Sequence, residues 1–210
     1  MSRIYSILTI GLLMIFGVQN LVAGSLPDPN ITNSKEYILT IGDSNGEGPG
    51  KWPDQLRKKL SDHYKVINNS QSGRTVGFDN LGRTELNALK QLNKILNSAS
   101  DKTGKKGGFD LVLICLGTND SKACFDDRSD EVTPNLSIMI NNIRHYPFPN
   151  GQTPEIGIIT PPPYGDEAAR TEKYKDGDKR VEALIPQYKK LAKDLNCHFI
   201  DIHTPLKPVI

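Results

Sequence analysis

The sequence predicts a doubly wound α/β fold, in which a parallel sheet carries helices on both faces. Short apolar, β-branched runs recur between residues 37 and 202, and amphipathic segments with helical spacing separate them. Strands that alternate with helices in this way are joined by right-handed crossovers and pair in parallel. The chain has 210 residues, which is enough for one such domain and too few for two of typical size.

The elements follow one another regularly along the chain. The predicted strands are residues 37–41, 65–68, 111–116, 156–160 and 199–202, and the predicted helices are residues 52–61, 84–97, 134–145 and 184–195. The third strand reads LVLICL and is apolar throughout, which is typical of a strand covered on both faces. Residues 164–179 lack periodicity and predict a long loop, a kind of connection that is usually functional or disordered.

The first two dozen residues differ from the rest of the chain. Arg3 supplies a positive start, residues 7–18 are nearly all apolar, and residues 21–24 end in small side chains. This layout predicts a secretory signal peptide over residues 1–24, a mature domain over residues 25–210, and a secreted or periplasmic location. A lipoprotein anchor would need cysteine where Ser25 stands, so no membrane anchor is expected after signal removal.

Charge and cysteine usage exclude several classes of function. The formal net charge is +2, with acidic and basic residues mixed along the chain, which gives no indication of nucleic-acid binding. The lysines of residues 102–106 are interpreted as a solvated loop. Three cysteines, Cys115, Cys124 and Cys197, are too few for a disulfide scaffold. No Cys or His pair has ligand-like spacing near another, so neither a metal nor another cofactor is expected.

Polar residues follow the carboxyl ends of three predicted strands. Gly42, Asp43 and Ser44 end the first strand, Gly73 lies in the polar loop after the second, and Asn119 follows the third. Those strand ends share one edge of a doubly wound sheet, so the three loops can converge on one cleft. A serine at a sharp strand-to-turn corner is a candidate nucleophile, and backbone N–H groups with a side-chain amide suit a developing oxyanion. The pattern therefore indicates ester chemistry at Ser44.

Other interpretations of the same residues are weaker. Gly-Asp-Ser is also ordinary turn chemistry. A phosphate-binding loop would need glycine at position 45 and Ser or Thr at position 52, where Asn45 and Trp52 stand, and a dinucleotide fingerprint would need glycine in place of Lys51. A receiver-like signalling domain would use Asp43 as its phosphate acceptor, but the sequence lacks an acidic cluster and begins with a signal peptide.

Three blocks of the sequence resemble the SGNH, or GDSL, hydrolase family: GDS at residues 42–44, NSQSG at 69–73 and GTND at 117–120. The flanks at residues 116–122 and 160–163 look most like the branch of arylesterases and carbohydrate acetylesterases. The resemblance implies a flavodoxin-like three-layer sandwich with strand order 2-1-3-4-5. It also implies Ser44 as the nucleophile, with Ser44 N–H, Gly73 N–H and the Asn119 amide as the oxyanion hole. The implied activity is hydrolysis of short acyl esters, in particular acetyl esters, of a carbohydrate or small alcohol.

The family's fourth block, Asp-x-x-His, supplies the general base and its orienting carboxylate, and it has no match here. Asp201 and His203 are spaced one residue too close, and as residues of one strand they would share a face. The base therefore stays unknown. We expect the chain to stop before this block, with a dyad of Asp201 and His203 as the alternative. The alternative function is a catalytically impaired module that binds acylated glycans.

Overall fold

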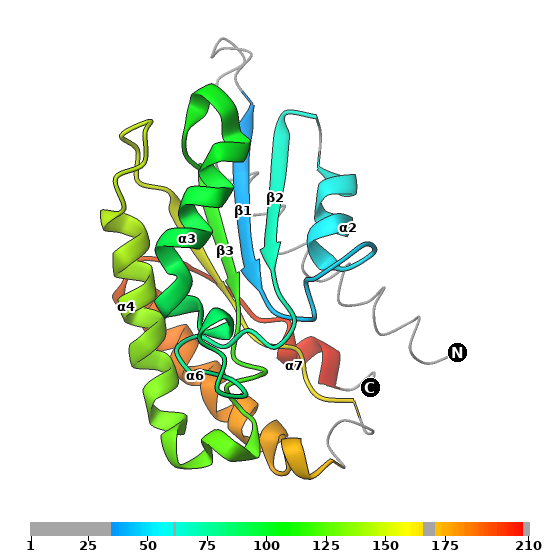
Figure 1. Cartoon of the computed structure of the whole chain (residues 1–210). Helices are drawn as coiled ribbons and strands as arrows, with labels where there is room; N and C mark the ends of the chain where they lie inside the picture. Colours follow the sequence, from blue (N-terminus) through cyan, green and yellow to red (C-terminus); the bar gives the residue numbers. More distant parts are fainter. Residues whose placement is uncertain (1–34, 61, 166–170, 208–210) are drawn as a thin grey trace.

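A parallel sheet of five strands forms the middle layer of the computed structural model, which describes residues 35–60, 62–165 and 171–207 (Figure 1). The strands pair in the order β2-β1-β3-β4-β5, all in parallel, so the predicted topology is confirmed. The strands are β1 (Glu36–Gly42), β2 (Tyr64–Ser70), β3 (Leu111–Cys115), β4 (Glu155–Ile159) and β5 (His198–Ile200).

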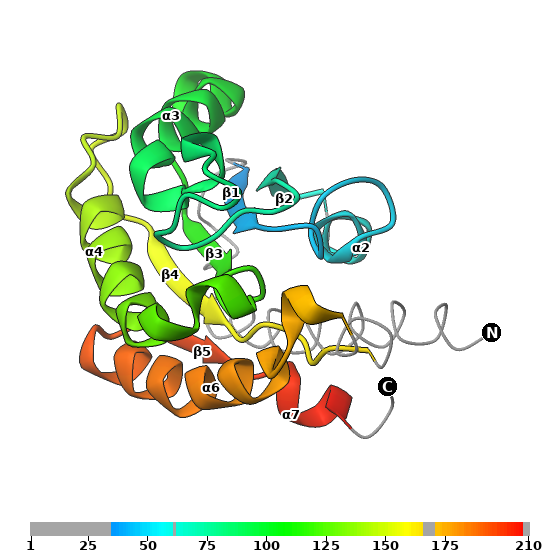
Figure 2. The same ribbon diagram turned by 60° about the horizontal axis from the view of Figure 1, so that its bottom comes forward.

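Helices cover both faces of this sheet. One face packs against α3 (Ala88–Ser100), α4 (Val132–His145) and α6 (Gly177–Asp194), and the other against α2 (Trp52–Lys59) and the short α7 (His203–Leu206). Figure 2, in which the carboxyl edge of the sheet comes toward the viewer, shows the two layers on either side of the strands.

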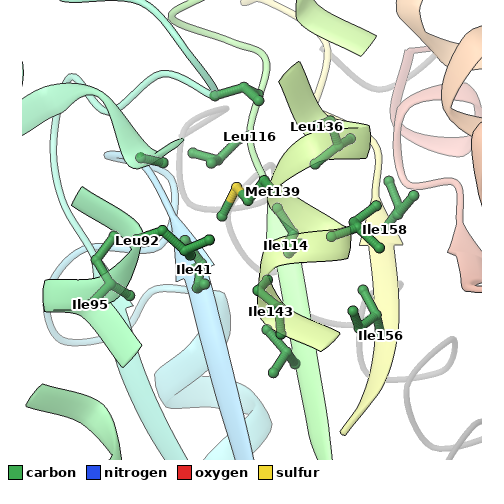
Figure 3. Packing of buried hydrophobic residues seen from close by; sticks show 14 of the residues in the cluster. Ile41, Leu92, Ile95, Ile114, Leu116, Leu136, Met139, Ile143, Ile156 and Ile158 are labelled. Carbon is green, nitrogen blue, oxygen red and sulfur yellow. The ribbon is translucent and has the colours of Figure 1, made fainter. Parts of the chain in front are cut away.

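Alternation along β3 explains its continuous apolar sequence. Val112 and Ile114 belong to the buried cluster under α3, α4 and α6, whereas Leu111, Leu113 and Cys115 belong to the cluster under α2 and α7. Figure 3 shows the first cluster, in which strand residues pack against apolar side chains of α3 and α4. Because both faces of the sheet are covered, every side chain of β3 is buried, and an apolar residue is needed at every position.

Two predicted helices differ from the observed ones by more than two residues at their amino ends. The segment predicted as residues 84–97 is divided into η1 (Thr84–Leu86) and α3, because the side chain of Asn87 accepts a hydrogen bond from Lys90 N and caps the second helix. The last helix begins at Gly177 instead of residue 184. The second half of the predicted loop therefore contains η4 (Glu172–Tyr174) and the first turns of α6, while residues 166–170 lie outside the described residues.

The loop predicted at residues 102–106 lies instead in a 3₁₀ helix, η2 (Asp101–Lys106), and Lys106 pairs with Asp110. The end of the chain corrects a further prediction. β5 ends at Ile200 and His203 begins α7, so the expectation that Asp201 and His203 share a strand face is wrong. The predicted signal peptide lies outside the described residues. Within the described part, no helix has both the length and the apolar character needed to span a membrane.

Candidate active site

Three loops meet at the carboxyl edge of the sheet, which is the lower edge in Figure 1. They follow β1, β2 and β3, which are neighbours in the order β2-β1-β3. We call them the first loop (residues 43–50), the second loop (residues 71–80) and the third loop (residues 116–122). Ser44, Gly73 and Asn119 lie one in each.

The first loop presents Ser44 on a tightly held turn. Asp43 is buried, and its Oδ1 accepts a hydrogen bond from Asn45 N at 2.8 Å. The backbone carbonyl of Asp43 accepts from Gly46 N at 3.0 Å and from Glu47 N at 3.1 Å. The side chain of Ser44 is exposed, and within the described residues neither its hydroxyl nor its N–H forms a hydrogen bond. The turn therefore leaves both groups available to a substrate.

The second loop contains a β-turn with Gly73 at its third position. Arg74 N donates to Gln71 O at 3.1 Å, and the φ of Gly73 is 84°, as a type II turn requires. A Cβ at this position would lie 3.2 Å from Leu86 Cδ1, so the site also lacks room for a side chain. The N–H of Gly73 donates to no other residue in the described part of the chain. Gln71 N donates to Gly42 O at 3.1 Å, which places the turn beside the first loop.

The third loop holds Asn119 against the second. Asn119 is buried, and its Nδ2 donates one hydrogen bond to Arg74 O at 3.1 Å. Since an amide nitrogen carries two hydrogens, the second remains for another acceptor. Val76 N donates to Asp120 Oδ1 at 2.8 Å. Asn45 Nδ2 in turn donates to Thr118 Oγ1 at 3.4 Å, and Ser72 N donates to Glu47 Oε2 at 2.8 Å, so all three loops are hydrogen-bonded to one another.

Two buried carboxyl groups take part in these contacts. Burial raises the pKa of Asp43, against the opposing effect of its hydrogen bonds with Asn45 and Thr118. Burial also raises the pKa of Asp120 to about 7, despite the hydrogen bond from Val76 N. Carboxyl groups this far from water favour the protonated form.

Two further residues, Arg74 and Tyr164, secure the loops, a role that the sequence does not predict for either of them. The guanidinium of Arg74 is buried and donates to the backbone carbonyl of Asn69, to Asn69 Oδ1 and, at 3.1 Å, to Gln71 Oε1. Burial lowers the pKa of Arg74 to about 10. On the other side, Tyr164 OH donates to Thr118 O at 2.6 Å. Neither residue belongs to a spaced motif, so no sequence signal marks it.

The structure does not join Asp201 to the imidazole ring of His203. Asp201 Oδ1 accepts from His203 N at 2.9 Å and Thr204 N at 3.0 Å, so this carboxylate caps the start of α7. His203 is buried, and its Nδ1 lies 3.2 Å from Pro161 O, while no hydrogen-bond partner of its Nε2 is found within the described residues.

The other described histidines lie elsewhere. His63 Nε2 lies 3.4 Å from a carboxylate oxygen of Glu36 and His198 Nε2 lies 2.9 Å from one of Glu155, at the amino edge of the sheet where β1 and β4 begin. His145 is the last residue of α4 and its Nδ1 bonds Asn141 O. Nor do the described residues include three or more His, Cys, Asp or Glu side chains arranged to hold a metal ion.

Comparisons with known proteins place this site in a family. The model of the GDSL-like lipase/acylhydrolase family matches residues 40–209, which include all three loops. A carbohydrate acetylesterase family member from Sinorhizobium meliloti has a similar structure, with a TM-score of 0.68 and 25% identity over 79% of this chain and 82% of that chain.

Two more solved structures show the same fold. A structure of Est24, a carbohydrate acetylesterase from Sinorhizobium meliloti, gives a TM-score of 0.67 and 24% identity over 80% of this chain and 84% of that chain. The aryl esterase of M. smegmatis gives 0.65 and 23% over 79% and 83%. No curated protein matches the sequence. Since the family model covers most of the chain, the chain belongs to the GDSL-like lipase/acylhydrolase family and is an ester hydrolase.

Proposed function

We propose that the chain hydrolyses short acyl esters, in particular acetyl esters of a carbohydrate or small alcohol, through an acyl-enzyme on Ser44. The observation that carries this proposal is the hydrogen bonding among the three loops. It gathers an exposed serine hydroxyl and three N–H donors with remaining capacity at one edge of the sheet. A serine with such donors around it suits acyl transfer.

The proposed reaction has two halves. Ser44 Oγ attacks the ester carbonyl, and the oxyanion that develops accepts hydrogen bonds from Ser44 N–H, Gly73 N–H and the second hydrogen of Asn119 Nδ2. The tetrahedral intermediate then releases the alcohol and leaves the acyl group on Ser44. Water attacks this acyl-enzyme, and the acid leaves through a second tetrahedral intermediate held by the same donors.

The general base stays unassigned. The proton of Ser44 has to pass to a base, and His203 is the described histidine at the carboxyl edge of the sheet. Its ring faces Pro161 O, and the carboxylate of Asp201 is engaged with backbone N–H groups. We therefore assign roles only to the nucleophile and the oxyanion donors. The activity of His203→Ala, measured beside that of Ser44→Ala, tests whether His203 is the base.

The choice of an acetyl group rests on similarity. The neighbour at 25% identity is described as a carbohydrate acetylesterase family member. A panel of p-nitrophenyl esters of increasing acyl length tests the choice, together with acetate release from acetylated monosaccharides. We expect kcat/KM to be highest for the acetyl ester and to fall with each longer chain. A preference for long acyl chains would overturn the acetyl assignment and leave the esterase intact.

We also propose that the chain is exported. The support is the sequence of residues 1–24, with its positive start, apolar stretch and small residues before Ser25. Full-length protein expressed with its own amino terminus should be found outside the cytoplasm, and its mass should correspond to a chain that begins near Ser25. An uncleaved chain retained in the cytoplasm would contradict export.

A further inference from the structure

Lys122 is a buried lysine that the proposed reaction does not use. Lys122 is only 2% exposed, although it lies in the third loop, close to the carboxyl edge of the sheet. Its Nζ donates to Asn80 Oδ1 at 2.9 Å, and within the described residues it forms no ion pair with a carboxylate. Burying an ammonium group without an opposite charge costs free energy, so a residue of this kind calls for a reason.

The partner of Lys122 leads to the oxyanion hole. Asn80 is completely buried, and its Nδ2 donates to Gly73 O at 2.6 Å. Asn80 is itself fixed by the backbone, because Asn80 N donates to Phe78 O and Arg83 N donates to Asn80 O, both at 3.0 Å. A chain of two hydrogen bonds therefore runs from Lys122 to the Gly73 turn.

The chemistry of lysine decides how the Asn80 amide points. An asparagine amide can rotate so that its oxygen and nitrogen exchange places. A protonated lysine only donates, so it must face Oδ1, and this leaves Nδ2 facing Gly73 O. With the amide reversed, Nδ2 would meet an ammonium group and Oδ1 would meet a carbonyl oxygen, and both contacts would be repulsive.

We propose that Lys122 and Asn80 are positioning residues of the oxyanion hole: Lys122 fixes the orientation of the Asn80 amide, and Asn80 holds the turn whose Gly73 N–H meets the oxyanion. This inference rests on the proposed function of Gly73. It also accounts for a buried cation at the edge of the sheet. Fixing Gly73 O constrains the peptide plane between Gly73 and Arg74, next to the donor, and the hydrogen bond from Arg74 N to Gln71 O closes the turn.

Lys122 stays charged near neutral pH although its burial disfavours the charged form. Burial, together with repulsion from Lys173, lowers the pKa of Lys122 to about 8, while Asp120 and Cys124 act in the opposite direction. Its Nζ lies 5.8 Å from the centre of the Tyr174 ring, close enough for a cation–π contact. Near neutral pH the group is therefore mostly the charged donor that orientation of Asn80 requires.

Two substitutions separate positioning from mere packing. Lys122→Met keeps the length of the side chain. It removes the buried charge but leaves Asn80 Oδ1 without its donor, so its two effects on the melting temperature oppose each other. Asn80→Asp keeps an acceptor for Lys122 and loses the donor to Gly73 O. Loss of a whole oxyanion donor lowers turnover by about 10² to 10³, and misalignment of one should cost part of this, about tenfold in kcat with little change in KM. A residue needed only for packing would lower the melting temperature and leave kcat of the folded variant unchanged.

The experiment measures p-nitrophenyl acetate kinetics and thermal unfolding at neutral pH. The proteins compared are the wild type, Ser44→Ala, Lys122→Met and Asn80→Asp. Lys122→Arg is added because arginine, like lysine, only donates hydrogen bonds. Lys190→Met, at an exposed lysine, is the control. We expect Lys122→Met and Asn80→Asp to lose kcat with little change in KM while they remain folded at the assay temperature, and Lys122→Arg to recover part of the loss. Asn80→Asp should also have a lower melting temperature, because its carboxylate faces Gly73 O. Unchanged kcat in both variants, with Ser44→Ala inactive, would overturn the positioning role alone. Full activity of Ser44→Ala would overturn the proposed function, on which the positioning role rests.

Discussion

At the scale of single residues, the amide nitrogen of Asn119 has two hydrogens to donate. One hydrogen goes to Arg74 O and the other is assigned to the oxyanion. Because the second bond strengthens as charge develops, Asn119→Ala should lower kcat by about 10² to 10³ and change KM little. Steady-state kinetics with p-nitrophenyl acetate measure this, with Asn93→Ala on the exposed side of α3 as the control. A rise in KM at unchanged kcat would show that Asn119 only binds substrate.

Asp120 predicts a pH dependence of stability. Burial raises the pKa of Asp120 in the folded state to about 7, above the ordinary value of 3.8 for an aspartate. The folded state therefore holds a proton that the unfolded state releases. The stabilisation that this provides is complete at a pH below the unfolded pKa and is lost as the pH rises through about 7.

Asp120→Asn should remove this dependence, since Asn keeps an acceptor for Val76 N and has no charge to bury. Urea unfolding should show the variant to be more stable than the wild type at a pH above about 8, by on the order of 1 to 3 kcal/mol, with the difference shrinking toward pH 5. A constant difference across this range, or a variant less stable at alkaline pH, would contradict the raised pKa of Asp120.

At the scale of elements, the Gly73 turn combines a backbone requirement with a steric one. Gly73→Ala places a Cβ 3.2 Å from Leu86 Cδ1 and 3.3 Å from Asn80 Nδ2, at a φ of 84°. The left-handed backbone alone should lower the free energy of unfolding by about 1 to 2 kcal/mol. Displacement of the turn should in addition lower kcat, because the N–H of residue 73 moves away from the oxyanion.

Gly151→Ala is the matched control for this turn. Gly151 has a φ of 68° and open space around its Cβ position, and it lies between α4 and β4, at the opposite edge of the sheet. Thermal unfolding should show destabilisation of both variants, larger in Gly73→Ala because of its added steric contacts, while only Gly73→Ala loses kcat. Equal activity of the two variants would argue against a catalytic place for the Gly73 turn.

The bounds of the elements show where sequence patterns stop being informative. The apolar periodicity assigned to α6 begins only at Leu184, although the buried Val181 continues the same face three residues earlier; the turn before Val181 is polar. That turn has a structural purpose, since Arg180 Nε donates to Ser121 O at 2.9 Å. Likewise, the end of β5 depends on Asp201, whose carboxylate caps α7. Such capping and clamping contacts are made by single polar residues, which carry no periodic signal.

At the scale of the whole molecule, local patterns predict the parallel sheet, whereas the order of its strands is implied by the family resemblance. Alternation of strands and helices restricts the topology to a parallel sheet, and the apolar sequence of β3 requires cover on both faces. The same topology made it possible to predict that the loops of Ser44, Gly73 and Asn119 would be neighbours, because all three follow adjacent strands.

The rest of the site could not be predicted, for a physical reason. Tyr164 meets Thr118, which lies 46 positions away in the chain, and Lys122 meets Asn80, which lies 42 positions away. In the sequence, an isolated tyrosine or lysine looks the same whether it lies on a solvated surface or holds two loops together. Only the three-dimensional arrangement shows that these residues hold the loops.

The most direct test of the account is the rate of p-nitrophenyl acetate hydrolysis by Ser44→Ala beside the wild type. Ser98→Ala, an exposed serine of α3, is the control. We expect the wild type and Ser98→Ala to hydrolyse the ester at the same rate, and Ser44→Ala to lose at least about 10³ in kcat while it unfolds at the wild-type temperature. A folded Ser44→Ala variant that keeps the wild-type rate would contradict the account, because the nucleophile would then lie elsewhere.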